Sequence, residues 1–262
     1  MIQNLFGFEA STKTLRKKIF LFGAMVVASL SAGAQNIQLH YDFGRHIYHD
    51  EEADRQNVTL TFEGFSADKL GSWYYFVDID ATKNGVISGY TEVSREFTFA
   101  KVRQNNAFAA HIEYDGGLSK AAGTFQSAVL VGPAWNGHNA DYSTTYSIQA
   151  MYKQFFGQAK EFNGGARRYA SFQLTGVWST TFAKKKCTFS GFIDLWRGKR
   201  ASNGHGTLVV LAEPQFWYNI TRKISVGTEW EFSNHFIYRG VSTGVDNDKF
   251  YFNPTLAFKF NL

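Results

Sequence analysis

Carboxylates and aromatic rings recur along this chain at positions where a β-strand would gather them on one face. In residues 58–65 and 73–80 these side chains alternate with apolar residues, and an extended strand keeps such alternating positions on separate faces. A carboxylate accepts hydrogen bonds from hydroxyl groups, and a ring stacks on a flat heterocycle, so these faces can handle a small solute. The predicted solute-binding residues are Glu63, Tyr74, Phe76, Asp78, Asp80, Glu92, Glu113, Phe192, Asp194, Trp196, Glu213, Trp217, Glu229 and Tyr251.

The last segment, residues 250–262, shows the kind of element that must hold these side chains. Its sequence, FYFNPTLAFKFNL, puts Phe, Pro and Leu on one face of a strand and Tyr, Asn, Thr, Ala and Lys on the other. Similar segments recur back to residues 36–43, joined by alternately long and short connections. Such strands close most simply with the apolar face in lipid and the polar face around a lumen. The predicted fold is an all-β transmembrane, antiparallel, up-and-down β-barrel of about 12 strands.

Two places depart from this regular alternation. Arg95 interrupts an apolar face, which indicates either a β-bulge or a position at the membrane interface. Residues 124–135 alternate weakly, and the pair Gly132-Pro133 can kink the strand there, because proline lacks the N–H that a central strand needs. Both places are expected to deform a strand without ending the barrel.

Residues 1–34 are predicted to be a secretory signal peptide. A basic patch at Lys13, Arg16, Lys17 and Lys18 precedes the apolar residues 19–30, and Ala32-Gly33-Ala34 supplies small residues for cleavage. The apolar run is shorter than the roughly 20 residues that a spanning helix needs. The barrel is therefore assigned to residues 35–262 and to the outer membrane of a Gram-negative cell.

The composition favours this membrane barrel over a secreted β-sandwich or a lipocalin-like barrel. Aromatic residues make up 17% of the chain, as expected where rings lie at both bilayer interfaces. The formal net charge is +5, and the four basic residues and one acid of the signal contribute +3 of it, which leaves +2. A nearly balanced barrel gives no support for binding a nucleic acid polymer. Cys187 is the single cysteine, so no internal disulfide can form.

Residues 58–80, VTLTFEGFSADKLGSWYYFVDID, resemble a known family. A strand ending in Phe62-Glu63-Gly64-Phe65, a short turn and an aromatic strand ending in Asp78-Ile79-Asp80 are similar to the nucleoside-specific outer-membrane channels of the Tsx family. Gly132-Pro133 and residues 190–196, SGFIDLW, add to the likeness. The overall sequence character resembles a distant, Bacteroidetes-type branch of that family. The chain ends in Asn261-Leu262, however, where many such barrels end in Phe.

This resemblance implies a narrow, monomeric channel that admits nucleosides and excludes sugars and amino acids of similar size. It implies membrane lipid and small solutes as partners and no cofactor. Aromatic faces would stack on the base, and carboxylates would bind the hydroxyl groups of the sugar. Stacking worth about 1–3 kcal/mol per base suits transient capture followed by release.

Other chemistries were weighed against the channel. The acids can instead bridge to Lys and Arg across the lumen and plug it, giving a structural barrel. A phospholipase would need Ser and His side by side, and consecutive Ser233-Asn234-His235 point in different directions. An omptin-like protease would pair Asp78 and Asp80 with His46 or His49. The two histidines precede an acidic run and can also bind a metal, although a solvated acidic loop explains them better. No catalytic or metal-binding residue is predicted.

Overall fold

The computed structural model describes residues 34–52, 55–119, 123–124, 126–157, 167–199, 205–236 and 248–262. The chain divides into the units Met1–Ala34 and Gln35–Leu262. The predicted signal peptide lies outside the described residues except for Ala34.

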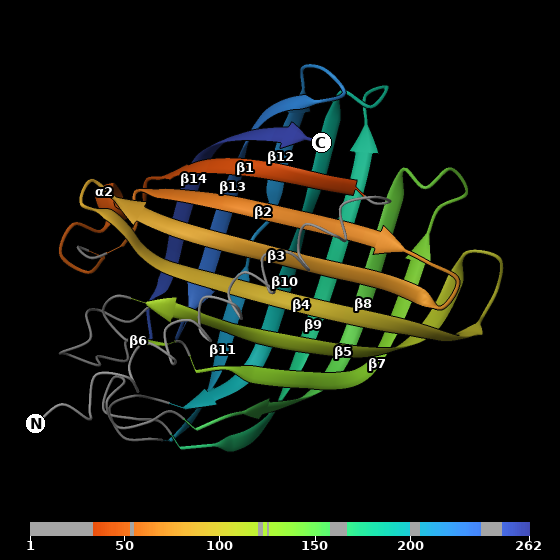
Figure 1. Ribbon diagram of the computed structural model, residues 1–262, viewed down its shortest axis with the longest axis horizontal. Coiled ribbons are helices and arrows are strands. Elements are labelled where there is room, and N and C mark those ends of the chain that lie inside the picture. The colour runs from red at the N-terminus through yellow and green to blue at the C-terminus, as the bar shows by residue number, and fades with distance from the viewer. Residues whose placement is uncertain are drawn as a thin grey trace, which may run out of the picture. The chain divides into compact units, whose positions relative to one another are not determined.

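Antiparallel pairings between neighbouring strands, including that of the two-residue β6 with β5, join the strands into one sheet (Figure 1). The elements are β1 (Ala34–Asp42), α2 (Gly44–Ile47), β2 (Val58–Ala67), β3 (Gly71–Thr82), β4 (Gly85–Lys101), β5 (Asn106–Ser119), β6 (Gly123–Thr124), β7 (Ala128–His138), β8 (Thr144–Phe155), β9 (Tyr169–Phe182), β10 (Cys187–Lys199), β11 (Gly206–Ala212), β12 (Gln215–Asn219), β13 (Ile224–Asn234) and β14 (Phe250–Asn261).

The sheet closes on itself because β14 pairs with β1, from Asn36 opposite Asn261 to Asp42 opposite Thr255. β11 and β12 act as one strand, since both pair with β10 and β13 in a single register. Their separation falls at Pro214, which has no N–H to donate to a ladder. The result is a closed antiparallel barrel of 12 strands, as predicted.

Side chains alternate between the two faces of this wall. On β14, Leu256 and Phe258 point outward and are 63% and 43% exposed, whereas Asn253 and Thr255 point inward and are buried. Apolar side chains outside and polar side chains inside reverse the pattern of a water-soluble barrel. Hydrocarbon around the wall stabilises this arrangement, because every ladder hydrogen bond is made within the closed sheet. The helix among the described residues, α2, is too short and too polar to cross a bilayer.

The two ends of the barrel differ. One end carries the short turns 68–70, 102–105, 139–143, 183–186 and 220–223, and the other carries α2 and the described residues 43–52, 55–57, 235–236 and 248–249. Figure 1 shows α2 at the opposite end of the barrel from the turn between β2 and β3. Outer-membrane barrels place short turns in the periplasm and long loops outside the cell, so the first end is called the short-turn end and the second the mouth.

The two predicted irregularities have different outcomes. Arg95 stands at the outer face near the short-turn end, so it is an interface position, and the register shifts lie at Asp80/Ala81 and between Thr98 and Ala100 instead. Residues around Gly132-Pro133 keep the same register with β8 on both sides. The strand β7 continues past this pair to His138.

Candidate functional site in the barrel lumen

A row of three aromatic rings lines the lumen along β3 and β4. The ring centroids of Tyr74 and Phe76 are 6.3 Å apart, and those of Phe76 and Tyr90 are 6.0 Å apart. Phe76 lies between two carboxylates, because Glu63 on β2 and Glu92 on β4 are its partners across the two ladders. The Tyr90 hydroxyl donates to Glu92 Oε1 at 2.9 Å. This aromatic row therefore places ring faces next to strong hydrogen-bond acceptors.

A group of four carboxylates, the acid wall, continues from the aromatic row. It consists of Glu92, Glu113, Asp115 and Asp194. Carboxylate oxygens of the first three lie within 4.8 Å of one another, close enough to hold a metal ion together. Asp194 accepts a hydrogen bond from the Thr175 hydroxyl on β9. So many carboxylates at short range make this part of the lumen acidic.

Lys153 is the cation that meets the acid wall among the described residues. Its Nζ is 3.0 Å from Asp115 Oδ2 and donates to Gln173 Oε1 at 2.8 Å. The same ammonium lies 5.1 Å from the ring centroid of Phe155 and 5.2 Å from that of Trp196. Asp115 Oδ1 is buried without a hydrogen-bond partner. One ammonium thus compensates only part of the negative charge.

A second charged group, the mouth cluster, lies at the mouth against β1, β13 and β14. It consists of Asp42, Glu52, Arg55, Glu231 and Asn253. The Arg55 guanidinium donates to Asp42 through Nε and Nη2 and to Glu231 Oε2 at 2.8 Å, and its Nε lies 3.4 Å from Glu52 Oε2. Asn253 Nδ2 donates to Glu52 Oε1 at 3.1 Å. Arg55 and Glu52 come from the loop after α2, so this cluster fixes that loop to β1, β13 and β14.

The wall formed by β12, β13 and β14 carries a third group of polar side chains. Lys259 Nζ lies 3.9 Å from the Trp217 ring centroid, and the Trp217 Nε1 donates to Gln215 Oε1 at 2.9 Å. Gln215 in turn donates to Glu229 Oε2 at 2.6 Å. Trp217 is fully buried in these contacts. Its ring is therefore held in place by a lysine and a glutamine, and little of it is offered to the lumen.

The structure divides the predicted solute-binding set among these groups. Tyr251 packs on Tyr48 near the mouth with a ring distance of 5.1 Å, and Asp80 accepts from the Thr59 and Ser88 hydroxyls. Phe192 shares a face with Asp194 by the alternation of β10. The aromatic row contains Tyr74 and Phe76, with Glu63, Asp78 and Glu92 around them. The acid wall contains Glu92, Glu113 and Asp194, with Trp196 beside them. The third group contains Trp217 and Glu229, and Glu213 lies close to Glu229.

Sequence reasoning missed Arg55 and Tyr90 as lumen residues. The acidic loop was expected to be solvated, yet Glu52 is buried and only Glu51 makes an exposed ion pair, with Lys249. The signal that could have found Arg55 is its spacing of three residues from Glu52 in a loop otherwise poor in cations. Tyr90 follows the same alternation as Glu92 and could have been included on that ground.

The residue pairs required by the enzyme alternatives are not assembled. Ser233 points into the lumen and donates to Glu231 Oε1 at 3.2 Å, whereas the ring of His235 lies beside the backbone oxygen of Leu208 and Asp248 Oδ1. His46 contacts the Tyr41 hydroxyl at 2.9 Å. Within the described ranges, the group of three residues that could hold a metal belongs to the acid wall and does not include His46 or His49.

A closed barrel of 12 antiparallel strands with an apolar exterior and a polar, aromatic interior defines the class of transmembrane β-barrels. Residues 34–262 match the family described as a domain of unknown function, DUF5020, and the chain belongs to that family. No curated protein matches the chain in sequence.

Two solved structures of porins are similar in fold. The NanC porin has a TM-score of 0.55 and 14% sequence identity, over 87% of this chain and 100% of its own. The KdgM porin has a TM-score of 0.49 and 10% identity, over 87% of this chain and 99% of its own. The family match is to DUF5020 and not to the Tsx channels, so the predicted resemblance is confirmed only at the level of the barrel fold.

Proposed function

We propose that this protein is a passive outer-membrane channel for nucleosides or similar small solutes that carry both a flat ring and hydroxyl groups. The barrel of residues 35–262 would reach the outer membrane after removal of residues 1–34, and would act as a monomer without a cofactor. The observation that carries the proposal is the aromatic row, in which Phe76 stands between Glu63 and Glu92. A base can stack on these rings while a ribose donates its hydroxyls to the carboxylates.

The charge of the lumen narrows the solute class. Carboxylates of the acid wall outnumber the single ammonium that meets them, so an anionic solute is repelled and a neutral or cationic one is admitted. Nucleosides without phosphate satisfy this condition. Their stacking energy, about 1–3 kcal/mol per base, is small enough for rapid release.

The test is uptake into liposomes that contain the purified barrel. Adenosine should enter faster than a neutral sugar of similar size, and adenosine monophosphate should enter more slowly than adenosine because of its charge. Phe76→Ala should lower adenosine uptake severalfold while changing sugar uptake little. Trp196→Ala, beside the acid wall, should act in the same direction.

Phe62→Ala is the matched control, because Phe62 lies on the neighbouring strand and faces outward, 38% exposed. It should leave both rates unchanged. Equal uptake of adenosine and sugar, or equal losses in Phe76→Ala and Phe62→Ala, would refute a nucleoside channel.

A plugged structural barrel is the second candidate, and the mouth cluster favours it because it fixes a loop across part of the lumen. Such a barrel would leave a planar bilayer without conductance and would take up neither solute. An enzyme in the same barrel would instead hydrolyse lipid or peptide, and His235→Ala would abolish that activity.

A further inference from the structure

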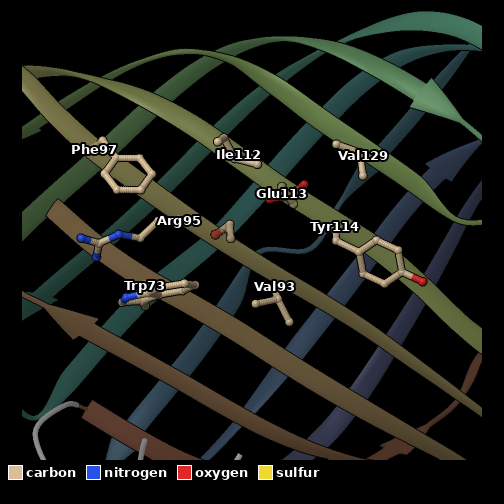
Figure 2. A pocket seen from close by; sticks show the side chains of 9 residues that line it. Trp73, Val93, Arg95, Phe97, Ile112, Glu113, Tyr114 and Val129 are labelled. Atoms are coloured by element: carbon tan, nitrogen blue, oxygen red, sulfur yellow. The ribbon is translucent and has the colours of Figure 1, made fainter. Parts of the chain in front are cut away.

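A groove of about 320 Å³ runs over the outer face of β3, β4, β5 and β7. Figure 2 shows Arg95 between Trp73 and Phe97 at one side of it, with Val93, Ile112, Tyr114 and Val129 on the other. Apart from Arg95, the labelled side chains that project from this outer face are apolar or aromatic. The groove therefore has an apolar part and one cationic end.

Arg95 is buried although it projects from the membrane-facing side of the wall. It is 7% exposed, whereas its neighbours Trp73 and Phe97 are 47% and 42% exposed. Its Cζ lies 5.1 Å from the Trp73 ring centroid and 4.9 Å from that of Phe97. An arginine that simply extends to water keeps its charged head exposed, so the position of this guanidinium needs another explanation.

The hydrogen bonds of this guanidinium are incomplete. Arg95 Nη2 donates to Asp68 Oδ1 at 2.8 Å, and Nη1 is buried without a partner. An unpaired buried donor on a charged group is costly, and the side chains around Nη1 shield it from water. Arg95 therefore carries one strong donor without an acceptor, at the side of the groove that Trp73 and Phe97 also line.

Asp68 adds the opposite charge at the same place. It lies in the turn between β2 and β3 at the short-turn end, and its side chain is 47% exposed. Its Oδ1 accepts from Arg95 and from the backbone N–H groups of Leu70 and Gly71. These hydrogen bonds hold the pKa of Asp68 below its usual range, and the bond from Arg95 has the largest effect. A negative and a positive group thus stand side by side at the level of the periplasmic headgroups.

We propose that this groove binds one phospholipid of the inner leaflet with an ethanolamine headgroup. The phosphate accepts from Arg95 Nη1 after a small rotation of the Trp73 or Phe97 ring, the ammonium lies against the Asp68 carboxylate, and an acyl chain follows Val93, Ile112 and Tyr114 toward the bilayer centre. A phosphatidylglycerol would place no cation beside Asp68, so charge complementarity selects the zwitterionic lipid. The inference rests on the membrane placement in the proposed function and not on the transported solute.

Native mass spectrometry of the whole barrel, released from detergent with phosphatidylethanolamine or phosphatidylglycerol, tests this site. The unchanged protein should retain one phosphatidylethanolamine at a severalfold lower lipid concentration than phosphatidylglycerol. Arg95→Met should lose this retention, and Asp68→Asn should make the two lipids equal. Lys223→Met is the control, because Lys223 also lies over an outward ring, that of Phe260, at the short-turn end.

Equal retention of the two lipids by the unchanged barrel would overturn the proposal, and so would retention by Arg95→Met that matches Lys223→Met. If Arg95→Met does not fold, the lipid ratio in Asp68→Asn decides: an equalised ratio supports the site and an unchanged ratio refutes it. Liposome uptake of adenosine reports on the channel separately, so failure of one proposal is distinguishable from failure of the other.

Discussion

The mouth cluster and the acid wall are built from the same kinds of residue and are balanced differently. In the mouth cluster a single guanidinium contacts Asp42 and Glu231 at 2.8 Å and stands near Glu52. In the acid wall a single ammonium contacts Asp115, while Glu92 and Asp194 accept from neutral hydroxyls. The first arrangement anchors a loop, because every carboxylate faces the same cation. The second leaves several carboxylates facing the lumen without a cation of their own among the described residues.

The largest effect should come from removing the cation of the mouth cluster. Arg55→Met leaves Asp42 and Glu231 buried without their shared donor, and breaking such a buried pair costs about 3–5 kcal/mol. The expected result is a clear fall in the unfolding temperature in detergent.

Lys249→Met is the control for this change, since its ion pair with Glu51 is exposed and should contribute nothing measurable. Similar unfolding temperatures for the two variants would mean that the mouth cluster does not hold the loop. The mouth cluster and the acid wall would then no longer differ in their structural role.

The next largest effect should be a pH dependence in how strongly the mouth cluster holds the loop after α2. Burial raises the pKa of Glu52 from 4.5 to about 7, against the opposing effects of Arg55 and Asn253. Because the docked state holds the proton more tightly, loop docking is strongest below pH 4.5 and weakens as the pH rises to about 7, by at most about 3 kcal/mol.

Hydrogen exchange of residues 43–52 should therefore be faster at pH 8 than at pH 5. Glu52→Gln keeps the hydrogen-bonding shape without the ionisation and should lose most of this pH dependence. If the variant and the unchanged protein show the same dependence, Glu52 does not control docking.

The smallest effect concerns ion selectivity at the acid wall. Replacing Glu92 by Gln and Asp194 by Asn keeps the hydrogen bonds from Tyr90 and Thr175 but removes two negative charges. The preference for cations over anions, measured from the reversal potential in a potassium chloride gradient, should fall severalfold.

Asp141→Asn, in an exposed turn, should leave the reversal potential unchanged. If the double variant kept its ion selectivity, the acid wall would have a structural role, like the mouth cluster, and no role in ion selectivity.

The sequence predicts the fold well because alternation is a local property. Leu256 and Phe258 on one face and Asn253 and Thr255 on the other can be assigned from their order alone, and the closed barrel follows from repeating that pattern. The same rule indicates the inward direction of Phe76 and Glu92. The interruption at Pro214 was not predicted, because the residues on each side keep one register and so leave the alternation intact.

The grouping of lumen residues could not be predicted, because it depends on which strands meet across the ladders and on where a loop folds. Arg55 lies 176 residues from Glu231 in sequence, and no local pattern joins them. Trp217 was expected to stack on a solute, but Lys259 covers its ring. Alternation gives the direction of a side chain and says nothing of its neighbours.

The pairing of β1 with β14 has a consequence for biogenesis. The final ladder joins Asn36 to Asn261, so the seam cannot be completed until the ribosome has released almost the entire polypeptide. A slip of one residue at this seam would turn Phe258 toward water and Lys259 toward acyl chains. The seam therefore needs both strands in one register, and a deletion of one residue within β1 or β14 should prevent closure of the barrel.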